Sequence, residues 1–98
     1  MKEVLVIISS DPEKGYLYEQ GIEVALNLSD ANIDVAVYVE QDFLKRLDVS
    51  ETDIYRKKLK QCLLFDIEVY SKESLGIDFI KEIHDENFFR NYRKVVTF

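Results

Sequence analysis

The chain has 98 residues, 19 of them acidic and 13 basic, and a formal net charge of −6. This length is typical of one domain, so residues 1–98 are expected to fold as a unit. The acidic balance argues against a nucleic-acid surface, which takes most of its affinity from basic side chains. A single cysteine excludes an internal disulfide, and no apolar run approaches the ~20 residues of a membrane span. Because no signal-peptide pattern precedes the first apolar run, the sequence predicts a cytoplasmic protein.

Two apolar runs flank a helix-length segment within residues 1–40. The runs are Val4–Ile8 and Val35–Val39, and both are nearly continuous in apolar residues, as in parallel strands that are covered on both faces. Between them, Tyr16–Leu28 places apolar residues at helical spacing. Since parallel strands need a crossover and a helix is the usual one, these residues predict a βαβ unit.

The residues after the second run predict two helices. Asp42 is placed to cap a short helical turn that carries Phe43 and Leu47. Ser50 with Asp53 resembles a capping box that opens the next helix. The apolar stripe of that helix has i, i+4, i+7, i+8 spacing and consists of Tyr55, Leu59, Cys62 and Leu63.

The last third of the chain predicts further strands and one more helix. Ile67–Tyr70 and Lys94–Phe98 have the composition of strands, and Asp85–Tyr92 is expected to be a helix that packs its aromatic residues. Phe79–Ile83 fits either a short strand or the start of a helix, and periodicity does not decide between them.

Few residues show the pattern of a reactive site. The loop 9–15 has one glycine and two acidic residues, which disfavours a phosphate loop. His84 is the only histidine and has no convergent partners for a metal or acid–base role, and no cofactor is predicted. The basic cluster at 56–60 is interpreted as a solvated helix face rather than an RNA-binding patch.

Cys62 is the only candidate for covalent chemistry. It lies late in a predicted helix and on its apolar stripe, where the helix dipole disfavours a thiolate. A buried structural thiol is therefore the favoured interpretation, and a sulfur-carrying cysteine is the alternative.

Several segments spread over nearly the whole chain match a known family in order and spacing. They are residues 8–15, 23–26, 34–44, 63–70, 74–77 and 91–98. Together they resemble the DsrE/DsrF/TusC superfamily of small sulfur-relay proteins, and the DsrF/TusC subunit type in particular.

The predicted fold is an α/β three-layer sandwich, with a flavodoxin-like, mostly parallel sheet of four to five strands and helices on both faces. The resemblance favours Phe79–Ile83 as the fifth strand. In DsrE/TusD members a persulfide-carrying cysteine sits where the third strand ends, a position that falls here on Tyr70 or Ser71. Neither residue can carry sulfane sulfur, so the resemblance implies a subunit with no catalytic residue of its own.

Two functions are expected from these observations. The first is a DsrF/TusC-like subunit in a hetero-oligomer with DsrE/TusD-like and DsrH/TusB-like chains, for tRNA thiolation or sulfur oxidation, without direct contact to nucleic acid or membrane. The alternative is a stand-alone homo-oligomeric DsrE-like protein that binds a small ligand where the strands end. The polar residues that would converge there are Ser9, Ser10, Gln41, Asp42, Ser71 and Lys72.

The aromatic content also predicts assembly. Six Tyr and six Phe are more than a core of this size can hide, and exposed aromatics are enriched at interfaces. The residues expected to contact other chains are Tyr16, Leu17, Tyr18, Gly21, Phe88, Phe89 and Phe98.

Overall fold

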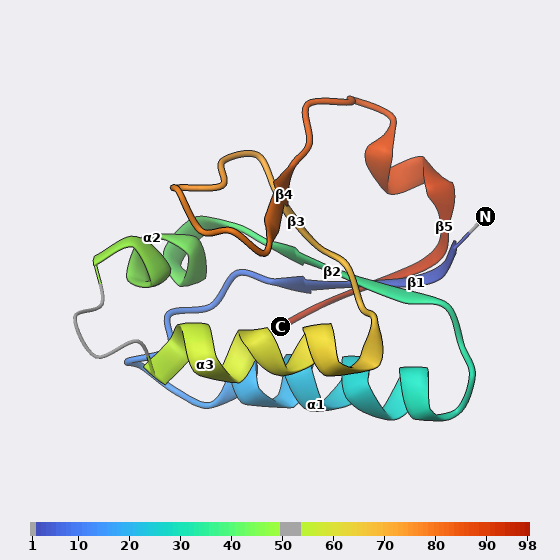
Figure 1. Cartoon of the computed structure of the whole chain (residues 1–98), viewed down its shortest axis with the longest axis horizontal. Helices are drawn as coiled ribbons and strands as arrows, with labels where there is room; N and C mark the ends of the chain where they lie inside the picture. Colours follow the sequence, from blue (N-terminus) through green and yellow to red (C-terminus); the bar gives the residue numbers. More distant parts are fainter. Residues whose placement is uncertain (1, 50–53) are drawn as a thin grey trace.

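Five parallel strands form one sheet in the order β4-β3-β2-β1-β5 (Figure 1). The structure, a computed structural model, describes residues 2–49 and 54–98. The predicted α/β fold with a parallel sheet is confirmed, and the segment at 79–83 does supply a strand. The strands are β1 Lys2–Ile8, β2 Val35–Val39, β3 Val69–Ser71, β4 Ile80–Glu82 and β5 Tyr92–Thr97.

The two faces of the sheet are covered unequally. In Figure 1, α1 and α3 run side by side along one face, and the short helix η2 lies on the other side of the strands. We call these the helical face and the η2 face. No described helix is both long enough and apolar enough to cross a bilayer. The helices are α1 Leu17–Asp30, α2 Gln41–Val49, α3 Ile54–Lys60, and the 3₁₀ helices η1 Gln61–Phe65 and η2 Phe88–Asn91.

The unequal cover follows from the handedness of the connections. From β1 to β4 the chain moves steadily across the sheet, and then it returns to add β5 on the far side of β1. Parallel crossovers are right-handed, so reversing the direction of travel transfers the connection to the opposite face. The segment between β4 and β5 therefore provides the cover of the η2 face.

Alternating residues of β1 build the two cores. Val6 and Ile8 join the large core under α1, α2 and α3, whereas Leu5 and Ile7 join a smaller one on the η2 face. Every residue of β2 is buried, as its unbroken apolar run predicted.

The crossover from β3 to β4, residues 72–79, contains no helix. Parallel neighbours are usually joined by a dozen or more residues that form one. Here Leu75 and Gly76 both have positive φ, 53° and 72°, and turn the chain back toward the start of β4. Ile77 then packs into the large core. The crossover thus lies beside α3 as an open loop.

Three details of the helices differ from the sequence predictions. The helix expected at 85–92 is only the 3₁₀ turn η2, because the Asp85 carboxylate and carbonyl accept the Asn87 and Phe88 amides in a tight turn and Tyr92 already begins β5. Leu63 is 41% exposed, because the chain tightens at Gln61 to three residues per turn and rotates Leu63 off the inner stripe. α2 begins one residue before Asp42, which lies inside the first turn instead of capping it. Ser50 and Asp53 lie outside the described residues.

Part of the predicted interface is used by the chain's own core. Tyr18, Gly21 and Phe88 are buried, and Phe98 packs half-buried against the helical face. Tyr18 stacks on Phe43 with ring centroids 5.6 Å apart, which explains its burial. The residues of that set that are exposed are Tyr16, Leu17 and Phe89.

Candidate functional site

The loops after β1, β2 and β5 meet at the carboxyl edge of the sheet. The amides of Ser9 and Ser10 donate to the Phe98 carbonyl at 2.8 and 3.3 Å. The Ser9 carbonyl accepts the Phe43 amide at 3.4 Å, which brings the start of α2 against the same loop. The edge is therefore closed largely by backbone hydrogen bonds.

An ion pair fixes the loop after β1 to α2. The Arg46 guanidinium donates to both carboxylate oxygens of Asp11, from Nε at 3.2 Å and from Nη2 at 3.4 Å, and also contacts Glu13 at 3.3 Å. The Glu13 amide donates to Asp11 at 2.9 Å, and this bond, together with Arg46, holds the pKa of the Asp11 carboxyl below its ordinary value. The charges of Asp11, Glu13 and Arg46 therefore hold the loop after β1 against α2.

The six predicted ligand residues are not brought into one pocket. Asp42 lines a cavity of about 340 Å³ with Asp11 and Arg46, while Lys72 lines a different cavity of about 340 Å³ on the η2 face. Ser71 is fully buried, and its hydroxyl accepts the Glu73 amide. Gln41 is exposed with φ of 52°. The two serines after β1 are half-buried, and the Ser10 hydroxyl has no hydrogen-bond partner among the described residues.

Aromatic side chains occupy the end of β3. The Tyr70 ring meets the Phe88 ring edge-on at 5.0 Å, and its hydroxyl donates to the Glu68 carboxylate. Burial raises the pKa of the Tyr70 hydroxyl well above its ordinary value, and the bond to Glu68 raises it further. We call the group around Phe88 the aromatic cluster; its members are Tyr38, Tyr70, Phe88, Phe89 and Tyr92.

Cys62 is buried completely, as the sequence predicted. Burial raises the pKa of its thiol to about 12, so the thiolate is scarce at neutral pH. His84 is exposed and its imidazole lies 3.6 Å from Glu82. Among residues 2–49 and 54–98, no cluster of His, Cys, Asp and Glu has the arrangement of a metal site.

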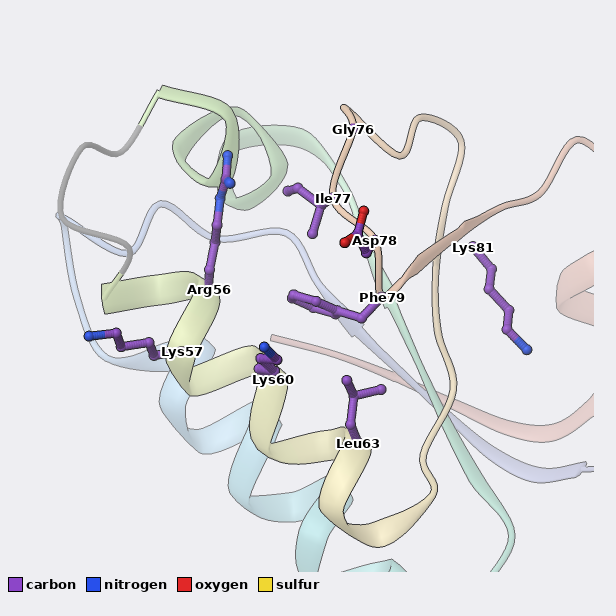
Figure 2. A pocket seen from close by; sticks show the side chains of 9 residues that line it. All are labelled: Arg56, Lys57, Lys60, Leu63, Gly76, Ile77, Asp78, Phe79 and Lys81. Carbon is purple, nitrogen blue, oxygen red and sulfur yellow. The ribbon is translucent and has the colours of Figure 1, made fainter.

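A groove beside α3 was not predicted from the sequence. It is an open groove of about 680 Å³ between α3 with η1 on one side and the β3–β4 crossover on the other (Figure 2). The signal for it was the basic cluster at 56–60, but that cluster faces a groove only because the crossover has no helix. The lining residues are Arg56, Lys57, Lys60, Leu63, Gly76, Ile77, Asp78, Phe79 and Lys81.

Comparisons with protein-family models, curated proteins and solved structures found no match to this chain. Function is therefore inferred from two features of its own geometry. The first is the aromatic cluster at the end of β3, and the second is the basic groove beside α3.

Proposed function

We propose that this chain is a non-catalytic subunit of a cytoplasmic sulfur-relay assembly of the DsrF/TusC type. The observation that supports it most directly is the end of β3. There the resemblance places a carrier cysteine, and this chain has the Tyr70 ring packed on Phe88 and a fully buried Ser71. The single thiol of the chain, that of Cys62, is buried, and this burial raises its pKa. Such a chain would shape and hold a partner's sulfur site without carrying sulfur itself.

The η2 face is where we place the cysteine-bearing partner. Its cover is thin, and Phe89 of the aromatic cluster is 37% exposed. Val95, 43% exposed, pairs in register with Leu5 and so lies on the same face. Within residues 2–49 and 54–98, β5 pairs only with β1, which leaves its outer edge open. Exposed aromatic and aliphatic side chains beside an open strand edge suit a protein interface.

Co-expression with the DsrE/TusD-like and DsrH/TusB-like chains of the same organism tests this proposal. Native mass measurement should give a stable complex that contains all three chains. Phe89→Asp should weaken that complex, because it places a charge in an apolar contact. The matched control is Leu64→Asp, since Leu64 is also exposed, at 83%, but belongs to η1 on the other face. Equal weakening by both variants, or no complex at all, would contradict the proposal.

Sulfur transfer provides a second readout. In the assembled complex, Cys62→Ala should leave the passage of labelled sulfur from a persulfide donor unchanged, because the Cys62 thiol is buried. Loss of transfer in Cys62→Ala, with the complex intact by native mass measurement, would show that Cys62 is a carrier.

A stand-alone homo-oligomer that binds a ligand at the strand ends is the second candidate. The cavity on the η2 face favours it, because Lys72 and His84 from two strand ends line it together with Tyr38. Sedimentation of the isolated chain distinguishes the two functions. A defined homo-oligomer that does not exchange with partner chains would favour this second function.

A further inference from the structure

We propose that the groove beside α3 binds a free mononucleotide, with the base against Phe79 and the phosphate beside Lys60. This proposal is independent of the sulfur-relay function and of the strand ends. It rests on the shape, the charge and the apolar floor of the groove.

The shape follows from the helix-free crossover. α3 and η1 form one wall of the groove, and Ile77, Asp78 and Phe79 of the crossover form the other (Figure 2). A volume of about 680 Å³ falls within the ~300–1,000 Å³ range of small-molecule sites. No side chain of a crossover helix fills this space, so it is open to a ligand.

The groove is cationic although the chain is acidic. Among the residues that the structure describes, four basic side chains line it, and Asp78 is the one carboxylate. Lys57 and Lys60 form no ion pair with the described residues, whereas Lys81 lies 3.1 Å from Glu68. Arg56 is held in place by a 2.9 Å hydrogen bond from its Nε to the Leu47 carbonyl. An anionic group is therefore the complementary ligand.

Lys58 shows that this charge is directed. It lies in the same run of basic residues as Lys57 and Lys60, but it lies 3.6 Å from Glu19 of α1 and does not line the groove. The basic cluster thus separates into Lys58, which is bound to α1, and Lys57 and Lys60, which line the groove; of these two, Lys60 lies beside the Phe79 ring, and the Lys57 side chain points away from the crossover (Figure 2). Lys57 and Lys60 are both exposed, as the prediction of a solvated helix face expects, and they also line the groove.

The floor of the groove is apolar. The Phe79 ring points from the crossover toward α3 and lies near Lys60, with Leu63 below it (Figure 2). Leu63 is 41% exposed, and Ile77 is almost fully buried. Inorganic phosphate would leave this floor uncovered, and an uncharged ring would leave Lys60 without an anion. A planar base that carries a phosphate satisfies both, because bases stack on aromatic rings and phosphates pair with ammonium groups.

The occupant we favour is a free nucleotide instead of an RNA strand. A strand needs cations along its whole path, and the net charge of −6 opposes a polyanion outside the groove. Within the groove, Asp78 from the crossover limits the room for further phosphates. One nucleotide fits these limits.

Titration of the ¹⁵N-labelled protein with AMP, monitored by NMR, tests the proposal. AMP should give saturable shifts at the amides of residues 56–63 and 76–81. Its affinity should exceed that of adenosine and of inorganic phosphate by about tenfold each, since each of these fragments makes only one of the two contacts. A five-nucleotide oligoadenylate should bind no more tightly than AMP, and markedly tighter binding would overturn the assignment to a free nucleotide.

Matched charge variants complete the test. Lys60→Gln should raise the Kd for AMP about fivefold or more, and Lys58→Gln should leave it unchanged. Phe79→Leu should weaken AMP about fivefold while phosphate binding stays the same. If Phe79→Leu fails to fold, the comparison of the two lysines still decides. Equal weakening by Lys58→Gln, or no saturable shift at millimolar AMP, would overturn the proposal.

Discussion

Gly21 offers a sharp test of how α1 packs on the sheet. The residue lies where the helix crosses Ile8 and Phe98, and a Cβ atom there would lie 3.1 Å from Ile8 Cγ1, 3.1 Å from Phe98 Cδ1 and 3.2 Å from Phe98 Cβ. These distances are shorter than ordinary van der Waals contact. Phe98 is poorly able to withdraw, because its amide donates to the Ile7 carbonyl at 2.7 Å and its carbonyl accepts the Ser9 amide at 2.8 Å.

Two opposing terms set the expected effect of Gly21→Ala. Alanine is favoured over glycine inside a helix by about 1 kcal/mol. Forcing an extra methyl group into a packed core costs about 1–3 kcal/mol. Because two of the three close contacts are to the anchored Phe98, we expect the packing term to dominate. Gly21→Ala should lower the free energy of unfolding by about 1 kcal/mol.

Urea denaturation followed by circular dichroism measures this change. Gly15→Ala is the matched control, since a Cβ at Gly15 meets nothing within 4 Å, and its effect should be zero or slightly stabilising. Combining Gly21→Ala with Phe98→Ala should reveal a coupling of about 0.5 kcal/mol, because the close contact with Phe98 Cδ1 disappears with the ring while those with Ile8 Cγ1 and Phe98 Cβ remain. A Gly21→Ala variant that is more stable than the original chain would refute the reasoning, since helix propensity would then outweigh packing.

Three further predictions concern buried or paired groups. Cys62→Ser should lower the free energy of unfolding by about 1–3 kcal/mol, because it buries a hydroxyl without a hydrogen-bond partner. The native Cys62 thiol should react slowly with thiol reagents at neutral pH, and labelling at the rate of a free thiol would contradict its burial. Tyr70→Phe should cost about 1 kcal/mol by removing the bond to Glu68, and ultraviolet titration should place the Tyr70 pKa above its ordinary value of 10. Arg46→Ala should destabilise the fold at neutral pH, and its stability difference from the original chain should vanish as the pH falls through the lowered pKa of Asp11, because that carboxyl stabilises the fold only while it is ionised. Thermal unfolding measures this difference, and an equal loss of stability at about pH 7 and at about pH 2 would contradict the prediction.

The local sequence pattern was sufficient to predict the two buried strands β1 and β2 and the helix α1 between them. The continuous runs of β1 and β2 and the helical spacing of α1 are strong signals, and each element lies within a few residues of its predicted bounds. β4 is different, since Phe79–Ile83 alone fitted a strand or a helix. It became a strand prediction only through the resemblance to a family.

Features that depend on the tertiary arrangement were not readable from the sequence. The 3₁₀ turn η1 rotated Leu63 outward, a change that the helical spacing of the stripe could not anticipate. The candidate ligand residues were grouped on the assumption that all strand ends share one pocket, yet Asp42 and Lys72 line separate cavities. The basic groove depends on the crossover lying beside α3, and nothing in the residues of α3 indicates that arrangement.

The central position of β1 has a consequence for how the chain reaches this fold. Leu5 pairs with Val95, ninety positions away, whereas its other partner, Ala36, belongs to the same βαβ unit as Leu5. Contacts over such separations form slowly, so the βαβ unit can assemble first while β1 still presents an apolar open edge. That interval is when the chain is most prone to aggregate. Once β5 docks, the outer edge of the sheet carries the exposed side chains of Arg93 and Lys94, whose charges discourage further strand pairing.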